Sequence, residues 1–504
     1  MGWPSVTDAA QAPKLTLRVK ALYGLGALSG ASKLQLFGLI LLFYTQLVGV
    51  DPRLVSLALS LALFVDAFWD PIVGQVSDNT RSRLGRRHPY LYAAAIPAAI
   101  CFALIFTPPL GWSDEALFFY LVVTVIAGRM LDSLVDVPGS ALMPELTSNY
   151  EERTSIQGWR FGLGFVAGGA VAAILGYGYF LRSTKAQPFG QLNIAGYAPY
   201  AIAVAAIGAI TVLISARATQ RFIPYLHRPQ RRRLSLGAMA RETGLALGNR
   251  NFVSLAASAL IFGVSQGVTQ GLLPFFYTYF FELPSSGALL WVRLAAIPGG
   301  LLGVMLAPFG VKLWGKKRAC LGVFYASILS TTIPLGGRLL GLLPPNHTPA
   351  ILAILIADTM TTTALGLMGF VIVTSMIGDV TEDVQVRTGQ RSEGLLFAVD
   401  SLLRKLSNSF SVVIPGLLLA YVGLPKFAKP GHVDPRIMTH LALIYLPIAV
   451  GLTLCSTSAI WFYRIDKARH TDNLVRIADA TALLEEADPE MEVAEGPGIL
   501  PRSV

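Results

Sequence analysis

The sequence predicts an all-α membrane protein with twelve transmembrane helices in two related six-helix halves. Of its 504 residues, 53% are hydrophobic and only 14% are charged, whereas a soluble protein carries about 25% charged residues. A short internal repeat supports two halves, because "LGRRH" (84–88) follows the second apolar run and "WGKKR" (314–318) follows the eighth. Matching segments at corresponding places are typical of membrane folds built from duplicated units.

Apolar runs of membrane length recur from one end of the chain to the other. A run of ~20 apolar residues spans a bilayer as a helix, which satisfies its own backbone hydrogen bonds. In chain order the predicted spans are 21–48, 54–76, 90–110, 115–138, 157–181, 196–216, 252–280, 285–311, 319–341, 348–377, 393–423 and 435–463. They divide the chain into an N-terminal segment (1–20), one half (21–216), a linker (217–250), a second half (251–464) and a tail (465–504).

Basic residues gather in short loops on one side of the predicted membrane. Residues 81–87 contain four arginines, residues 312–318 contain four basic residues, and the linker is also basic. This bias places both termini and the linker in the cytoplasm. The net charge of +10 therefore reflects orientation in a membrane, and nucleic-acid binding is rejected. No targeting segment is recognised, so we expect the protein in a bacterial inner membrane. We also expect a monomer.

The stretch "VDAFWDP" (65–71) places Asp66 and Asp70 inside the second predicted span. Their i, i+4 spacing puts both carboxylates on one helix face, one turn apart. Two buried like charges repel each other, and a bound Na⁺ or a proton on one of them relieves that repulsion. Hard cations also prefer oxygen ligands, so the pair predicts a cation site. The alternative is that a buried arginine or lysine neutralises each aspartate, and that the group only stabilises the bundle.

The fourth span repeats this spacing in Asp132 and Asp136, with Ser133 beside them and Arg129 one turn before Asp132. We expect Arg129 and Asp132 to form a structural ion pair. Asp136 is a candidate for binding substrate hydroxyl groups, because a carboxylate accepts several hydrogen bonds. The alternative for Asp136 is a carboxylate at a helix end that solvent satisfies.

Aromatic side chains are abundant, and most of those in a helical bundle pack or anchor the interface. Trp159 is the best candidate for a face against a sugar ring, because it stands beside Arg160 at the start of the fifth span.

The eleventh span contains Asp400, Arg404 and Lys405. Asp400 and Arg404 are four residues apart, so we expect them to pair. Lys405 lies about twelve residues into its span, where snorkelling to the interface is difficult. It therefore needs an acidic partner, and Asp66 or Asp70 from the other half would serve. Such a bridge would link ion occupancy to movement of the halves.

No catalytic or nucleotide-binding motif stands out. The chain lacks the GxxxxGK[ST] phosphate loop, so ATP-driven transport has no support. Its six histidines show no metal-ligand spacing. We therefore expect no enzyme and no cofactor, only a coupling cation, Na⁺ or H⁺.

Three longer segments resemble a known family. They are "DAFWDPIVGQVSDNTRSRLGRRHPYL", "SLVDVPGSALMPELTSNYEERTSIQGWRFGLGFVAG" and "MIGDVTEDVQVRTGQRSEGLLFAVDSLLRKLSNSF". They are similar to the spans 2–3, 4–5 and 10–11 of the glycoside–pentoside–hexuronide:cation symporters, the group of melibiose permease. The resemblance implies the major facilitator fold and alternating access.

The resemblance also implies roles at the cation site. Asp66 and Asp70 match the family's two cation-site aspartates. Ser133 falls where a hydroxyl helps to hold the cation, and Lys405 matches a lysine near it.

On the substrate side, Asp136 matches a sugar-binding aspartate and Arg160 matches an arginine near the sugar. We add Trp159 and Asp132 as substrate candidates from their positions. One departure matters, because Ala31 stands where melibiose permease has a second sugar-binding aspartate. Melibiose-like substrates are therefore in doubt.

The sequence is thus interpreted as a secondary active symporter that couples Na⁺ or H⁺ to a sugar or glycoside. An alternative is a proton-coupled carrier of another solute, such as a lysophospholipid or other amphipathic molecule. A receptor built on the same fold is a third reading, which retained binding without flux would support.

Overall fold

The computed structural model describes residues 15–147, 149–185, 187–226, 248–388 and 393–465, together with 469, 471–473, 475 and 476. Most of the predicted N-terminal segment, linker and tail lies outside these residues. Within them every regular element is a helix, and eleven helical segments are long and apolar enough to cross a membrane.

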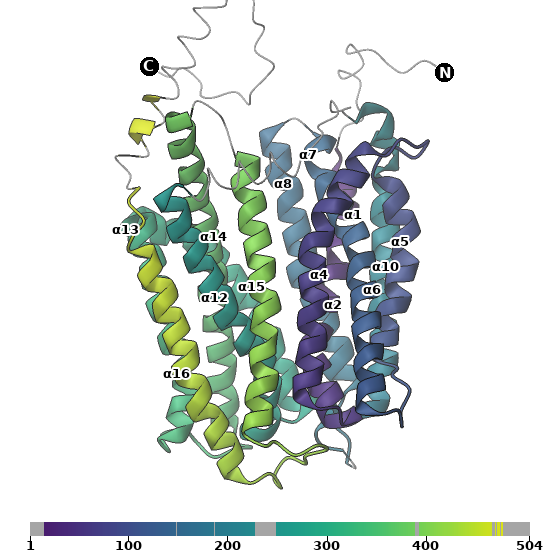
Figure 1. Ribbon diagram of the computed structural model, residues 1–504, viewed down its shortest axis with the longest axis vertical. Coiled ribbons are helices and arrows are strands. Elements are labelled where there is room, and N and C mark those ends of the chain that lie inside the picture. Colours follow the sequence, from purple (N-terminus) through teal and green to yellow (C-terminus); the bar gives the residue numbers. More distant parts are fainter. Residues whose placement is uncertain are drawn as a thin grey trace, which may run out of the picture.

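The N-terminal half is a bundle of six membrane-length segments (Figure 1). They are α1 (Leu17–Gly24), α2 (Gly26–Phe37), α3 (Ile40–Phe43) and η2 (Tyr44–Val48); α4 (Pro52–Asn79); α5 (His88–Ile105); α6 (Asp114–Ala141) and α7 (Met143–Leu146); α8 (Tyr150–Phe161), η3 (Gly162–Gly168), α9 (Gly169–Ala173) and η4 (Ile174–Phe180); and η5 (Gly190–Leu192), α10 (Ile194–Thr219) and η6 (Gln220–Tyr225).

The C-terminal half lies beside the first (Figure 1). It consists of α12 (Arg250–Phe275), η7 (Phe276–Phe280), η8 (Ser285–Leu289), α13 (Leu290–Leu339), α14 (Pro349–Thr388), α15 (Glu393–Tyr421) and α16 (Pro435–Ile460). The long α13 joins the predicted spans 285–311 and 319–341. Gly315 breaks it with φ 74° and ψ 160°, so the eleven segments make twelve crossings.

Two predicted ends differ from the structure. The third span ends at Ile105 and not at 110, because Pro108 and Pro109 follow and the residue before a proline avoids helical geometry. The tenth continues to Thr388, well past 377. Hydropathy indicates which residues favour contact with lipid. A helix can extend beyond that segment into water as long as its backbone hydrogen bonds continue.

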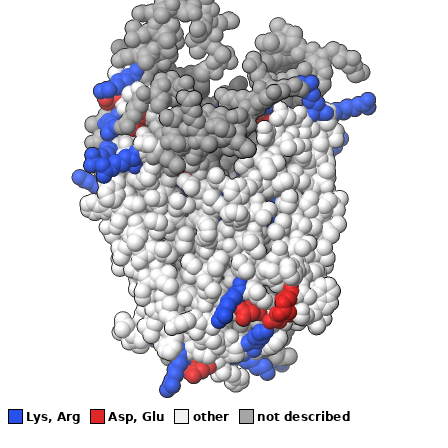
Figure 2. Space-filling model, in the orientation of Figure 1, with Lys and Arg blue, Asp and Glu red and all other residues white. Residues whose placement is uncertain are grey.

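A nearly uncharged surface separates the charged ends of the molecule (Figure 2). Large apolar side chains are exposed on it, for example Phe119 at 65% and Val123 at 64%. An exposed apolar surface of this extent would drive a soluble protein to aggregate, and it marks contact with lipid.

The repeat predicted from "LGRRH" and "WGKKR" is confirmed by the backbone. Gly85 and Gly315 stand at equivalent places in the two halves, and both have φ +74°. Residues with a Cβ atom rarely adopt a φ of this sign, whereas glycine adopts it readily, so glycine suits both turns.

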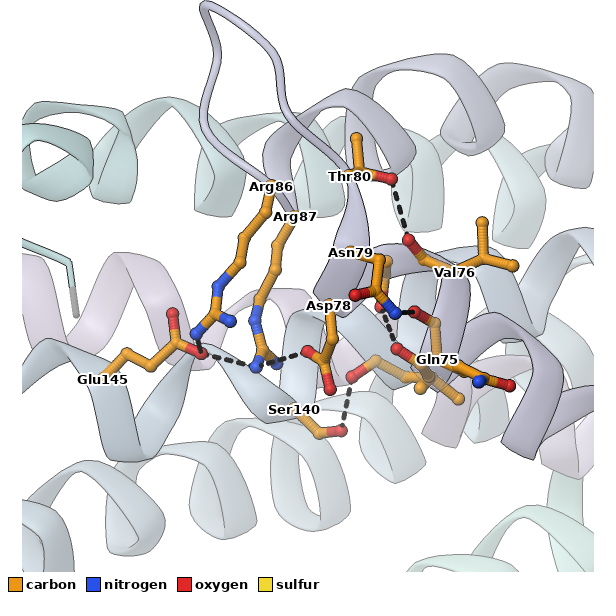
Figure 3. A network of polar contacts seen from close by, with 12 residues as sticks. Gln75, Val76, Asp78, Asn79, Thr80, Arg86, Arg87, Ser140 and Glu145 are labelled. Carbon is orange, nitrogen blue, oxygen red and sulfur yellow. Dashed lines mark hydrogen bonds and ion pairs between the residues drawn. The ribbon is translucent and has the colours of Figure 1, made fainter. Parts of the chain in front are cut away.

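The basic residues that follow these glycines make equivalent ion pairs. Arg86 lies 2.5 Å from the Glu145 carboxylate, which Arg87 also contacts, and Arg87 lies 3.0 Å from Asp78 (Figure 3). In the second half Lys316 pairs with Asp379 on α14 at 2.6 Å. Each half thus ties its basic turn to its own fourth span.

The two halves are joined at mid-depth and at the end away from these basic turns, the outer end. At mid-depth Ser409 of α15 donates its hydroxyl to the Ser60 carbonyl of α4 at 2.8 Å. At the outer end Lys426 pairs with Asp114 at 2.9 Å, and the Gln191 backbone N–H donates to the Ser285 hydroxyl at 2.8 Å. The last two contacts join the halves at their outer end.

Candidate cation and substrate site

Asp66 is at the centre of a polar cluster between α4 and α6. Its side chain is only 2% exposed. One carboxylate oxygen accepts the Ser133 hydroxyl at 2.9 Å. The other accepts the Arg129 guanidinium at 2.6 Å and the Lys405 ammonium at 3.0 Å. Ser133 thus contacts Asp66, and its predicted part in holding a cation stays a prediction.

Lys405 reaches from α15 of the second half to both aspartates of α4. It contacts the Asp66 carboxylate and the Oδ2 atom of Asp70. The predicted bridge between Lys405 and this pair is therefore confirmed as a contact. Asp70 Oδ1 is buried and has no hydrogen-bond partner among the described residues, so one acceptor in the cluster remains unused.

The cluster is balanced in charge. Asp66 and Asp70 carry two negative charges, and Arg129 and Lys405 carry two positive ones. This is the arrangement that the alternative interpretation describes, with basic side chains neutralising both carboxylates. Of the two basic groups, Lys405 is the one that the second half supplies.

The predicted ion pair between Arg129 and Asp132 is wrong. Arg129 turns to Asp66, and Asp132 instead accepts the Lys33 ammonium of α2 at 2.5 Å. Residues three apart on one helix are neighbours, but the adjacent helices bring an oppositely charged group closer to each.

Lys33 is the charged residue that our reading of the sequence missed. It is buried, and its ammonium lies 5.6 Å from the centre of the Phe102 ring. A signal was present, because Lys33 lies roughly a dozen residues into the first predicted span. A basic residue at that depth needs an acidic partner.

A cavity of about 230 Å³ lies inside the first half, between α2, α5 and α6. Charged and aromatic side chains line it: Lys33, Arg129, Asp132, Asp136, Phe37 and Phe102. At ~30 Å³ for each water molecule, this space would hold a small solute such as one sugar ring. Leu34 also lines this cavity and is 68% exposed.

Asp136 is an open acceptor in this wall. It is exposed, and no hydrogen bond or ion pair links it to another described residue. Its carboxylate lies beside Gly30, where an added Cβ would come within 3.8 Å. The substrate candidates Asp136 and Asp132 therefore share one cavity.

Arg160 braces helices close to this cavity. It donates to the Tyr23 hydroxyl at 2.8 Å and to the Gly139 carbonyl at 3.0 Å. A much smaller cavity, of about 20 Å³, is lined by both Asp136 and Arg160. Trp159 is not among the residues that line these two cavities, and its contact with a sugar stays a prediction.

Comparison with known proteins identifies the family. The sequence profile of the family described as "MFS/sugar transport protein" matches residues 22–467. The chain belongs to this family. It is a major facilitator protein, as the resemblance implied, and a secondary transporter rather than an enzyme.

Relatives of this transporter are similar over nearly the whole chain. A candidate glycoside/cation symporter of Escherichia coli strain K12, YagG, is 25% identical and covers 90% of this chain and 94% of its own. The isoprimeverose transporter of Lactiplantibacillus pentosus is 25% identical, with 85% and 84% covered. The crystal structure of a D-xylose-proton symporter shares the fold, with a TM-score of 0.56 at 17% identity over 90% of this chain and 97% of that one.

The transporter also contains the predicted pair within α15. Arg404 donates to the Asp400 carboxylate at 2.7 Å. Asp400 and Arg404 therefore pair with each other on one helix, whereas Lys405 reaches the first half.

Replacing Lys33 or Asp132 alone is expected to destabilise the transporter, and replacing both is expected to restore most of the loss. Each single variant leaves a charge without its partner in a mostly buried place, and breaking such a pair costs about 3–5 kcal/mol. Thermal unfolding of Lys33→Met, Asp132→Asn and the double variant measures the coupling. Strictly additive losses would show that the two side chains do not depend on each other.

Proposed function

We propose that this transporter couples Na⁺ or H⁺ to the movement of a glycoside, and that the cation acts by displacing Lys405 from Asp70. The observation that carries the proposal is the bridge from Lys405 to Asp66 and Asp70, which joins the halves at mid-depth. The buried, unused Oδ1 atom of Asp70 supplies an acceptor for the incoming cation.

The proposed coupling follows from the charge balance of the cluster. A cation that arrives beside Asp66 and Asp70 makes the cluster positive by one, and repulsion then favours release of Lys405. Sodium would take its ligands from the two carboxylates and the Ser133 oxygen, whereas a proton would bind an Asp70 oxygen. In both cases the bridge between α4 and α15 weakens, and the halves are freed to rock about the central site.

The proposed glycoside site is the larger cavity. Asp132 and Asp136 would accept hydrogen bonds from sugar hydroxyl groups, and the Phe37 and Phe102 rings would supply apolar faces. Arg160 would set the position of the wall that carries Asp136. The relatives named for glycoside and isoprimeverose transport support this substrate class.

We infer that the end with the basic turns faces the cytoplasm, in keeping with the excess of basic residues there. The bacterial relatives support a bacterial inner membrane.

One chain supplies every residue of the proposed sites, so a monomer would be sufficient. We propose residues 21–216 and 251–464 as the two halves that move against each other.

Transport currents across liposomes containing the purified protein test the proposal. Glycosides, pentosides, hexuronides and lysophospholipids would each be applied with and without Na⁺ at two pH values. A current with one glycoside class that requires Na⁺ or a proton gradient is expected. A response to a lysophospholipid alone would overturn the glycoside assignment.

Asp136→Asn is expected to weaken sugar binding by about 10–100-fold. Hydrogen bonds to a charged acceptor contribute about 1.5–3 kcal/mol, and every 1.4 kcal/mol changes affinity tenfold. Equilibrium exchange of labelled sugar gives the KM without any driving gradient. The cation concentration for half-maximal transport should remain as in the parent protein. An unchanged KM for the sugar would remove Asp136 from the site.

A further inference from the structure

Asp358 of α14 is a carboxylate inside the membrane that the proposed coupling does not use. It lies nine residues after Pro349, the first residue of α14, and at 1.5 Å for each residue that is roughly 14 Å from the outer end. The hydrocarbon core is about 30 Å thick, so Asp358 is near mid-depth. It belongs to the second half, whereas Asp66 and Asp70 belong to the first.

The partners of Asp358 are hydroxyl groups. Ser330 of α13 donates to its Oδ1 atom at 3.1 Å, and Thr362 of α14 is 3.4 Å from the same atom. The two hydroxyls also contact each other at 2.7 Å. The Oδ2 atom makes no hydrogen bond to a described residue.

No basic side chain forms an ion pair with Asp358 among the described residues. The phenols of Tyr277 and Tyr445 are the other titratable groups near it. Arg293 of α13 lies with its guanidinium 5.5 Å from the centre of the Tyr277 ring and makes no ion pair with Asp358.

Most of the transporter's other described aspartates at membrane depth have an ion-pair partner. Asp136 has none among the described residues, but it is exposed, whereas Asp358 is partly buried. Asp66 and Asp70 contact Lys405, Asp132 contacts Lys33, and Asp400 contacts Arg404. An ionised carboxylate at this depth without a partner costs at least ~2.5–3.5 kcal/mol. A neutral carboxylic acid avoids that cost and needs only hydrogen-bonding partners.

We propose that Asp358 is a second proton-binding site, in the C-terminal half and independent of the Lys405 bridge. The proton adds to Oδ2, and Oδ1 accepts the hydrogen bond from Ser330. The carboxylate would bind a proton from one side of the membrane and release it when the C-terminal half changes its exposure. The proposal makes the transporter sensitive to pH even where Na⁺ is the ion at Asp66 and Asp70.

Infrared spectroscopy of the full chain in liposomes tests this without any sugar. A protonated carboxyl group has a C=O stretching band that shifts in D₂O, and an ionised one does not. The spectrum of the parent protein minus that of Asp358→Asn at neutral pH is expected to contain this band, lost as the pH is raised. Asp400→Asn is the matched control, because Asp400 has an ion-pair partner in Arg404, and its difference spectrum should lack the band.

Ser330→Ala keeps the carboxyl group and provides a second test if Asp358→Asn folds poorly. Loss of the donated hydrogen bond should move the C=O band to higher frequency. The absence of the band at neutral pH, or an unchanged band in Ser330→Ala, would overturn the proposal. Loss of the band when NaCl is added at constant pH would also overturn it, because the site would then take Na⁺. None of these results depends on transport, so the glycoside assignment is tested separately.

Discussion

Asp70→Asn is expected to abolish cation-driven accumulation of substrate while exchange without a gradient continues. Asparagine has nearly the shape of aspartate, but it can neither hold a proton at neutral pH nor offer a negative charge to Na⁺. We expect a loss of at least ~100-fold in cation affinity, which corresponds to about 2.8 kcal/mol. Uptake against a gradient and equilibrium exchange in the same liposomes measure the two activities.

Asp114→Asn is the matched control for this experiment. Asp114 also joins the halves through a lysine, Lys426, at 2.9 Å, but that pair is at the exposed outer surface and is worth roughly 0–1 kcal/mol. Accumulation should therefore survive in Asp114→Asn. If Asp70→Asn still concentrates substrate, Asp70 is not the coupling residue.

Lys405→Met is expected to tighten cation binding by about 10–100-fold and to weaken the coupling between cation and substrate. We propose that the Lys405 ammonium competes with the cation for Asp70. Without this ammonium, Arg129 is, among the described residues, the one basic group left beside the two carboxylates. A hydrogen bond between charged groups contributes about 1.5–3 kcal/mol, and in the variant the cation would not have to break the bond between Lys405 and Asp70. The cation dependence of exchange measures affinity, and the ratio of cation to substrate flux measures coupling.

A purely structural role for Lys405 predicts a different result. Lys405→Met would then lower the unfolding temperature and leave the cation affinity of the folded fraction unchanged. Lys426→Met controls for the loss of a lysine that bridges the halves, because its partner Asp114 is exposed and no carboxylate pair is uncovered. A variant of Lys405 that is less stable but binds the cation normally would contradict displacement.

Much of the fold and part of the site could be predicted from the order of residues alone. Membrane spans can be predicted because the ability of a segment to cross the bilayer depends on the composition of about 20 consecutive residues. The shared face of Asp66 and Asp70, and the pair of Asp400 with Arg404, follow from helical periodicity within one segment. Lys405 could be assigned an acidic partner because an unpaired ammonium at that depth is too costly.

Other features were decided by the tertiary structure. Periodicity within α6 places Arg129 next to Asp132, yet Arg129 binds Asp66 and Asp132 binds Lys33. The choice depends on how α2 and α4 are rotated against α6, which no local pattern contains.

The sequence by itself determined the spans, the duplicated basic turns and which charges had to find partners inside the membrane. The tertiary structure decided which partner each charge found, and it left Asp358 with hydroxyls alone. The physical reason is that the free-energy cost of burying a charge depends on one residue and its depth in the membrane. The interaction that offsets this cost depends on which group a neighbouring helix brings within hydrogen-bonding distance.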